Sequence, residues 1–273
     1  MKNRVNLGLV GVVVLLAAVA GILFWQNGNL ASAERCAAGR SCQTTVSGDG
    51  LKLNVVSVDQ ADIFFNIQAE YPQISGADPA FNAKIAATVN GLIDKFKTEA
   101  KDDFAARNAT RPVGQASLSN PDEPFDFIAA WTPAQFGPRY ASFMVDIYYF
   151  SGGAHGTDQV FAFNYDLQNQ KEITISDFMG SPANLDKLAK LSRDQVISQL
   201  QANGLQANDS LTQMTNDGTK AVPDNYRNFN FGYGKFTVYF EQYQVAPGSA
   251  GTVTLNFYKS DLDQAGIATS YLN

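Results

Sequence analysis

The sequence predicts an α+β fold in which an antiparallel β-sheet meander is packed by two main amphipathic helices. Three observations lead to this prediction: apolar residues alternate in several short runs, they recur at helical spacing in two longer ones, and aromatic residues make up 12% of the chain. No internal repeat and no Gly/Ser linker divides the body. We therefore expect one domain over residues 51–273, preceded by an N-terminal segment (1–25) and a stalk (26–50).

The strands are expected mainly in the middle and at the end of the chain. In residues 139–150, one face would carry Phe143, Val145, Ile147 and Tyr149, and the other Ser142, Met144, Asp146 and Tyr148. The connections between the runs of residues 125–178 are too short for crossovers, so these strands should be antiparallel. The runs expected to form strands are 51–58, 62–71, 125–133, 139–150, 158–167, 169–178, a hairpin within 228–240, and 251–262.

Two helices are expected, each beginning with a capping residue followed by proline. Asp78-Pro79 precedes an apolar stripe that begins at Phe81, and Ser181-Pro182 opens a second helix that extends to Gly204. A polar segment up to about residue 223 reads as a loop that has room for a short helix. Each amphipathic helix should cover one face of a sheet.

The amino terminus carries the information on location. Lys2 and Arg4 precede residues 7–25, which contain no charge and match the ~20 residues that cross a bilayer as a helix. The basic residues predict that the body lies outside the cytoplasm. Either the segment is an uncleaved anchor, giving a single-pass inner-membrane protein, or it is a signal cleaved after Ala33, giving a periplasmic or secreted one.

Only two cysteines are present, Cys36 and Cys42, just beyond the hydrophobic segment. In an oxidising compartment an isolated even pair predicts a disulfide. A metal site would need further Cys or His ligands, and His155 is the single histidine of the sequence. We therefore expect a Cys36–Cys42 disulfide, no metal and no cofactor.

Charge and motifs exclude several classes of function. The net charge of −6 and the lack of clustered Lys and Arg argue against nucleic acid as a partner. The fingerprints of zinc hydrolases, serine acyl-transfer enzymes and nucleotide-binding folds are missing. The remaining enzymatic hypothesis is an envelope hydrolase that acts on cell-wall glycan or peptide and uses His155 with nearby carboxylates such as Asp158 or Asp166.

The stretch "YYFSGGAHGTDQVFAFNYD", residues 148–166, favours a structural role for the histidine. Gly152, Gly153 and Gly156 supply backbone freedom for a bulged connection between two long strands. Aromatic side chains that point away from the core there are suited to stacking on sugars or anchoring a protein. We expect a binding face near Tyr148, His155 and Tyr165.

The motifs "GGAHG" and "FNYDLQNQKEITISDF" resemble those of a domain family of unknown function found in the extracytoplasmic part of RsiV-type anti-sigma factors. Similar domains occur beside polysaccharide deacetylase modules and in a mycobacterial secreted immunogenic protein. The motif residues here are Gly152, Gly153, His155, Gly156, Asn164, Asp166 and Asp177. The resemblance implies an α+β fold and a sensing or binding role, and in RsiV-type proteins the domain binds lysozyme.

Two departures limit what the resemblance implies. Only six residues precede the hydrophobic segment, so we do not expect anti-sigma activity, and the single histidine does not fit a metal-dependent deacetylase. The sequence thus predicts a non-enzymatic cell-envelope protein that binds a lysozyme-like protein or peptidoglycan.

Overall fold

The protein is described by a computed structural model covering residues 41–48, 51–110, 124–150, 156–205 and 208–272. The hydrophobic segment 7–25, Ala33, Cys36, Gly152, Gly153 and His155 lie outside these residues, so the predictions made for them remain predictions. Within the described ranges, no helix has the length and apolar character needed to cross a membrane.

A seven-stranded sheet forms the first part of the molecule, and its strands follow one another in sequence order. Neighbouring strands are antiparallel except β3 and β4, which are parallel. The long helix α2 connects β3 to β4 and returns the chain to the end of the sheet at which β3 begins. The two strands therefore run in the same direction. The strands are β1 Ser41–Gly48, β2 Leu51–Ala61, β3 Phe65–Ile74, β4 Phe125–Phe136, β5 Tyr140–Phe150, β6 Thr157–Asp166 and β7 Lys171–Glu172.

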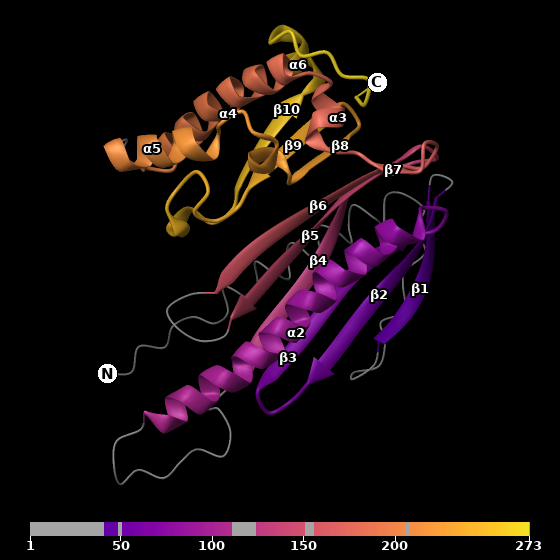
Figure 1. The fold of residues 1–273 in the computed structure, drawn as a ribbon, viewed down its shortest axis with the longest axis vertical. Coiled ribbons are helices and arrows are strands. Elements are labelled where there is room, and N and C mark those ends of the chain that lie inside the picture. The colour runs from indigo at the N-terminus through magenta and orange to yellow at the C-terminus, as the bar shows by residue number, and fades with distance from the viewer. Residues whose placement is uncertain (1–40, 49–50, 111–123, 151–155, 206–207, 273) are drawn as a thin grey trace.

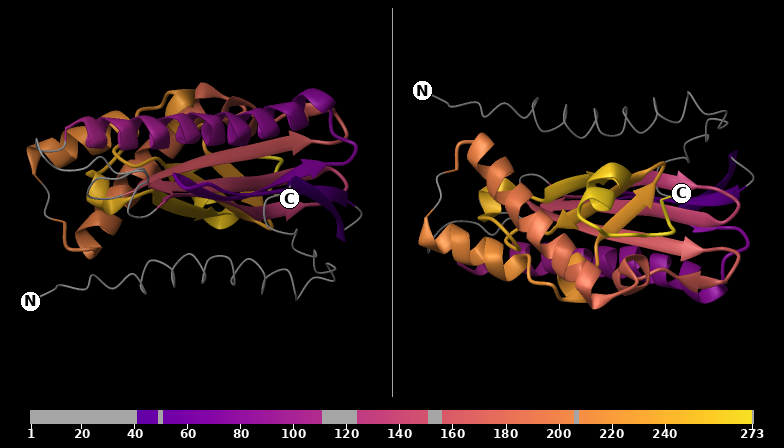
Figure 2. Two further views of the ribbon diagram at one scale, coloured as in Figure 1. Left: turned by 90° about the horizontal axis from the view of Figure 1, so that it is seen from below. Right: turned by 90° about the horizontal axis from the view of Figure 1, so that it is seen from above.

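Helix α2, Pro79–Ala109, covers one face of this sheet (Figures 1 and 2). Asp78 caps it by accepting a hydrogen bond from the Ala80 backbone N–H at 2.7 Å, as the Asp-Pro pair predicts. Its apolar stripe packs on the alternating residues of β3 to β6, and the Phe96 and Phe127 rings lie 5.4 Å apart. The expected alternation of β5 is confirmed, because Phe143, Val145 and Ile147 are fully buried in this core.

The second part of the molecule is a three-stranded antiparallel sheet covered on one face by α4. Ser181 caps α4 through the Asn184 backbone N–H, and Leu188 and Val196 of α4 are fully buried. The elements are α3 Ile175–Met179, α4 Pro182–Ala202, α5 Asp209–Gly218, η1 Pro223–Tyr226, β8 Phe229–Gly232, β9 Lys235–Phe240, η2 Gly248–Ala250, β10 Val253–Tyr258 and α6 Lys259–Gln264. The predicted α+β class with two main amphipathic helices is confirmed.

Residues 169–178 differ from the strand that the sequence predicts. Only Lys171–Glu172 pair with β6, and the rest turns into helix α3. Thr174 and Asp177 form a capping box, in which each side chain binds the other residue's backbone N–H. This local exchange of hydrogen bonds ends the strand and starts the helix.

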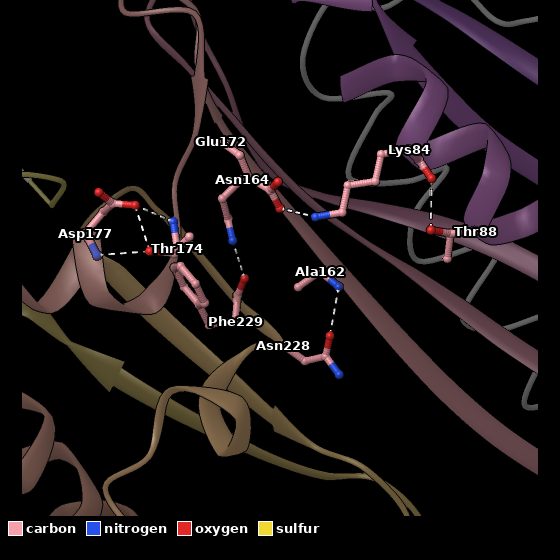
Figure 3. A network of polar contacts seen from close by, with 9 residues as sticks. All are labelled: Lys84, Thr88, Ala162, Asn164, Glu172, Thr174, Asp177, Asn228 and Phe229. Atoms are coloured by element: carbon pink, nitrogen blue, oxygen red, sulfur yellow. Dashed lines mark hydrogen bonds and ion pairs between the residues drawn. The ribbon is translucent and has the colours of Figure 1, made fainter. Parts of the chain in front are cut away.

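A buried polar network joins the two sheets where β8 lies across β5 and β6. Asn164 donates from Nδ2 to the Phe229 backbone oxygen at 2.7 Å (Figure 3). It also accepts a hydrogen bond from Ser142 Oγ at 2.7 Å. Asn230 donates from Nδ2 to the Phe143 backbone oxygen at 2.8 Å. Because these groups are buried, their hydrogen bonds specify how the sheets are placed relative to each other.

Candidate binding site

The middle strands of the large sheet bring three acidic residues and a tyrosine to the face opposite α2. In the register, Tyr148 of β5 lies between Ile128 of β4 and Asp158 of β6. Asp126 precedes Ile128 by two residues on the same face, and Asp146 precedes Tyr148 by two. We call Asp126, Asp146, Tyr148 and Asp158, together with Tyr239 of the second sheet, the acidic junction.

The ring of Tyr148 is held against the backbone of Gly156. A β-carbon at position 156 would lie 2.3 to 2.5 Å from the outer atoms of that ring, so only glycine permits this approach. Tyr148 remains half-buried. The last glycine of the "GGAHG" motif therefore leaves the space that the outer end of the Tyr148 ring occupies.

Two carboxyl groups of the junction, those of Asp146 and Asp158, are harder to ionise than usual. Asp146 keeps exposed surface, yet the surrounding protein partly removes its carboxyl group from water, and this effect, with the nearby charge of Asp158, raises its pKa to about 6. Burial also raises the pKa of Asp158. For Tyr148, burial and then the charges of Asp158 and Asp126 raise the pKa of the phenol.

The second sheet contributes Tyr239 of β9. Its phenol pKa is raised to about 12 by burial and by the negative charge of Asp146, which places the two side chains within electrostatic reach across the sheets. Among the residues that the structure describes, no Lys or Arg forms an ion pair with Asp126, Asp146 or Asp158. The junction therefore carries negative charge that the protein does not neutralise locally.

No metal centre is found within the described ranges, where no three His, Cys, Asp or Glu side chains gather closely enough to hold an ion. The junction's polar groups are carboxylates and phenols. Above pH 6 this set offers hydrogen-bond acceptors and negative charge, and it is therefore suited to a ligand that brings donors and positive charge.

The residues predicted for the binding face differ in where they lie and in how exposed they are. Phe150 and Gly156, the described residues on either side of the segment that contains His155, lie at the same end of the sheet as the acidic junction. Tyr148 is half-buried and lines the junction. Tyr165 is only 2% exposed and packs on Phe81 at 4.4 Å on the α2 side, so it presents no surface to a ligand.

The other motif residues hold the fold together. The Tyr165 hydroxyl accepts a hydrogen bond from the Asp78 backbone N–H at the start of α2. Asp166 is buried and accepts hydrogen bonds from the backbone N–H groups of Gln168 and Asn169 in the β6–β7 turn. These bonds and the Arg139 charge outweigh the effect of burial and lower the Asp166 pKa.

The carboxylates that lie close in sequence to His155 are separated in the structure. Asp158 is the second residue of β6 and Asp166 is the last, so the strand's rise places them about 26 Å apart. Asp177 lies near the end of β6 that carries Asp166, and it forms an ion pair with Lys171 at 2.8 Å. Of the three carboxylates Asp158, Asp166 and Asp177, only Asp158 belongs to the junction.

Sequence reasoning missed Asp126 and Tyr239 as members of this site. Asp146 could have been found, because the alternation in 140–150 already places it on one face with Tyr148. Asp126 joins them through the β4–β5 register, and Tyr239 through the packing of two sheets. Neither relation leaves a local signal in the sequence.

Comparisons with known proteins match two separate segments of the chain. Residues 59–158 match the family model described as Deacetylase PdaC, and residues 176–259 match the family of unknown function DUF3298. The first segment supplies the three aspartates and Tyr148, and the second supplies Tyr239. The acidic junction therefore combines residues from both matched segments.

One curated relative is the peptidoglycan-N-acetylmuramic acid deacetylase PdaC of Bacillus subtilis, 26% identical over 172 residues. The match covers 60% of this chain and 36% of that protein, so the chain spans about a third of its relative's length. This relation is distant, and the relative's activity is not thereby assigned to this chain.

Two crystal structures of DUF3298 family members have a similar fold. The one from Bacteroides fragilis is 14% identical, with a TM-score of 0.51 over 80% of this chain and 96% of its own. The other, from Pseudomonas aeruginosa, is 15% identical, with a TM-score of 0.49 over 82% and 97%. The first likeness supports the α+β fold; the expected link to anti-sigma factors stays an expectation.

Proposed function

We propose that this protein is a non-enzymatic binding or sensing protein of the cell envelope, with its body outside the cytoplasm, and that it recognises a basic, lysozyme-like protein. The relation to a protein named as a peptidoglycan deacetylase, together with the predicted N-terminal segment 7–25, supports a place beside the cell wall. The DUF3298 match adds no activity of its own.

The observation that carries the proposal is the unpaired acidic junction. Three aspartates share one sheet face and flank Tyr148, and none of them has a cationic partner among the described side chains. Asp59 and Glu70 continue the same face on β2 and β3. A basic partner would neutralise these charges, and the opposite charges would speed its association.

Tyr148 supplies the apolar component of the surface. A tyrosine combines a large contact area with a polar hydroxyl group, and few rotatable bonds are fixed when it binds. Its ring already packs against Gly156. Because a fixed aromatic group loses little conformational entropy on binding, this arrangement favours recognition of a protein surface.

Titration calorimetry with hen lysozyme tests the proposal, with soluble peptidoglycan fragments as the second ligand. We expect lysozyme to bind and the double substitution Asp146→Asn with Asp158→Asn to weaken binding by about tenfold. The matched control Asp102→Asn with Asp186→Asn removes the same charge from exposed helix positions and should change affinity less than about twofold.

The same titrations separate the two kinds of partner. Binding of peptidoglycan fragments but not of lysozyme would replace the protein partner by a glycan. Equal weakening by the junction pair and the control pair would show that overall charge, and not this site, attracts lysozyme. Alanine at Tyr148 and at His155 then tests the predicted contribution of each side chain.

A cell-wall hydrolase is the second candidate, because Asp146 has a pKa of about 6, which is suited to a general acid at neutral pH. In this case Asp146, Asp158 and His155 would act on glycan or peptide. Chromatography of purified peptidoglycan after incubation tests it. Released fragments or acetate that disappear with Asp146→Asn would favour the hydrolase, and unchanged peptidoglycan would remove it.

A further inference from the structure

Two exposed tyrosines lie at one end of the three-stranded sheet. Tyr233 is 73% exposed and Tyr258 is 59% exposed. Tyr233 lies in the turn between β8 and β9, and Tyr258 is the last residue of β10, which pairs with β9 (Figure 1). The Lys259 N–H donates to the Gly234 carbonyl at 2.8 Å. These two residues directly follow the tyrosines, so Tyr233 and Tyr258, called the tyrosine pair, project from adjoining backbone.

The backbone at Tyr233 favours a different type of residue. Its φ of +51° is in the left-handed region, and Gly234 follows at +74°. Such a two-residue hairpin turn prefers asparagine and glycine, because other side chains are strained at positive φ. At 73% exposure the ring gains little burial to offset this strain. Strain retained at an exposed aromatic residue points to a function of the ring.

Tyr258 also occupies a position at which other residue types are better suited. It is the N-cap of α6, and its backbone N–H donates to Asp261 Oδ2 at 2.8 Å. This bond is one half of a capping box, and the other half is normally a Ser or Thr hydroxyl at the cap. A phenol hydroxyl stands too far from the backbone to serve in this way. The Tyr258 ring is therefore required neither for the helix start nor for the core.

Both tyrosines are attached to well-fixed backbone. A β-carbon at Gly232 would lie 2.5 Å from the Ala134 backbone oxygen, so the β8–β9 turn packs directly on the end of β4. Tyr258 is held by its pairing with Lys235 and by the bond to Asp261. A ligand that stacks on these rings would have little backbone entropy to remove.

The polar groups beside the tyrosine pair are hydrogen-bond donors. Asn256 precedes Tyr258 by two residues and is exposed on the same face of β10. Its Oδ1 accepts a hydrogen bond from Thr237 Oγ1 at 2.9 Å, which leaves its Nδ2 group as a donor. Lys235, the register partner of Tyr258, adds an exposed ammonium group. The surface thus combines aromatic rings with donors for carbonyl and hydroxyl oxygens.

The charge at this end of the sheet is nearly balanced, in contrast to the acidic junction. Lys259 forms an ion pair with Asp263 at 2.8 Å, and Lys235 and Asp261 add one charge of each sign. A strongly charged partner is therefore not favoured here. The C–H faces of sugar rings stack on tyrosine, and acetamido and hydroxyl oxygens accept hydrogen bonds. An uncharged N-acetylated glycan matches each of these groups.

We infer that the tyrosine pair, with Asn256 and Lys235, forms a binding site for an uncharged N-acetylated glycan. Sugar rings stack on Tyr233 and Tyr258, and the acetamido oxygens accept from Asn256 and Lys235. The inference goes beyond the proposed function, because it concerns a second surface and a second kind of ligand. Lys235 and Tyr239 of the acidic junction are four residues apart on β9, about 13 Å along the strand.

NMR titration of the labelled full chain with chitotetraose, an uncharged chain of N-acetylglucosamine, tests the site. We expect saturable shifts at Tyr233, Lys235, Asn256 and Tyr258, with a dissociation constant of about 1 mM. Cellotetraose has the same ring faces but no acetamido groups, and it should bind about tenfold more weakly. Equal binding of cellotetraose would overturn the assignment to an N-acetylated glycan. No shifts with about 10 mM chitotetraose would overturn the site.

Two substitutions remove the rings while suiting the backbone better than tyrosine does. Tyr233→Asn places a favoured residue in the turn, and Tyr258→Ser supplies the hydroxyl that completes the capping box. Each should weaken chitotetraose binding by about tenfold without lowering the midpoint of thermal unfolding. The matched control is Tyr243→Asn, at a tyrosine that is 57% exposed with a φ of +69° beyond the other end of β9. It should leave binding unchanged.

These variants also separate a role in binding from a role in folding. Unchanged chitotetraose binding by Tyr233→Asn and Tyr258→Ser, with a lowered unfolding midpoint, would assign the rings to the fold and overturn the inference. Equal weakening by Tyr243→Asn would show that exposed tyrosines bind the sugar wherever they lie, and it would overturn the site as well.

The outcome is distinguishable from that of the proposed function. Lysozyme binding without chitotetraose binding would retain the acidic junction as a site and reject the tyrosine pair. Chitotetraose binding that depends on the tyrosine pair, without lysozyme binding, would retain the glycan site and reject the lysozyme-like partner.

Discussion

Asn164 in β6 and Phe229 in β8 are joined by a 2.7 Å hydrogen bond from the Asn164 side chain to the Phe229 backbone oxygen, and this bond connects the two sheets. Asn164→Ala would leave that oxygen and the Ser142 hydroxyl buried with fewer partners. We expect a loss of about 2–4 kcal/mol in the free energy of unfolding, measured in urea. Asn66→Ala, at a largely exposed hydrogen bond, should cost less than about 0.5 kcal/mol; equal costs would contradict a special role for the network.

Gly156→Ala should move the Tyr148 ring and not the backbone. The new β-carbon would meet the outer end of a side chain that can rotate away, so we expect a modest loss of about 1 kcal/mol in stability. In a Tyr148→Ala background the cost should vanish. A double-mutant cycle of urea unfolding measures this coupling, and a cost that persists without the ring would show that the backbone at position 156 is itself constrained.

Asp146 should make the protein less stable as the pH rises. Its pKa of about 6 in the folded state exceeds the unfolded value of about 3.9, so the folded protein holds the proton more tightly and stability falls between about pH 4 and pH 6. Asp146→Asn should therefore match the wild type at pH 3.5 and exceed it at pH 7.5. We expect about 1 kcal/mol after allowing for solvent screening. An equal effect at both pH values would contradict the raised pKa.

Asp177 should show the opposite dependence on pH. Burial would raise its pKa, but hydrogen bonds from Lys171 and Thr174 outweigh that effect and lower the pKa to about 2. Its contribution to stability is therefore complete above about pH 4 and lost as the pH falls through 2. Asp177→Asn should cost about 1 kcal/mol at pH 7 in thermal unfolding, since it breaks the capping box of α3. If the cost of Asp177→Asn does not shrink toward pH 2, the lowered pKa of Asp177 is contradicted.

Much of the fold could be predicted because its signals are local. Asp78 and Ser181 mark two helix starts by capping chemistry, and the period-two pattern in 140–150 separates the two faces of β5. The sequence also contains the residues of the capping box, Thr174 and Asp177. The alternation of apolar residues around them is typical of a strand, and this signal competes with the helix start. The parallel β3–β4 pair follows from the crossover by α2. The two strands are too far apart in the sequence for a local pattern to predict their pairing.

The candidate site was predicted less well because it depends on long-range contacts. Tyr148 was identified from aromatic content, whereas Tyr165 shares that pattern and is buried under α2. The spacing from Asp158 to Asp166 appeared short in sequence, but an extended strand separates them. Asp126 and Tyr239 enter the site through strand register and sheet packing, which are properties of the whole fold.

The most direct test of the acidic junction as a binding surface is chemical-shift mapping of the labelled protein during titration with hen lysozyme. We expect the largest saturable shifts at Asp126, Asp146, Tyr148 and Asp158, and we expect them to weaken as salt rises. Shifts confined to other surfaces, such as the exposed Tyr233 and Tyr258, or a spectrum that lysozyme leaves unchanged, would contradict it.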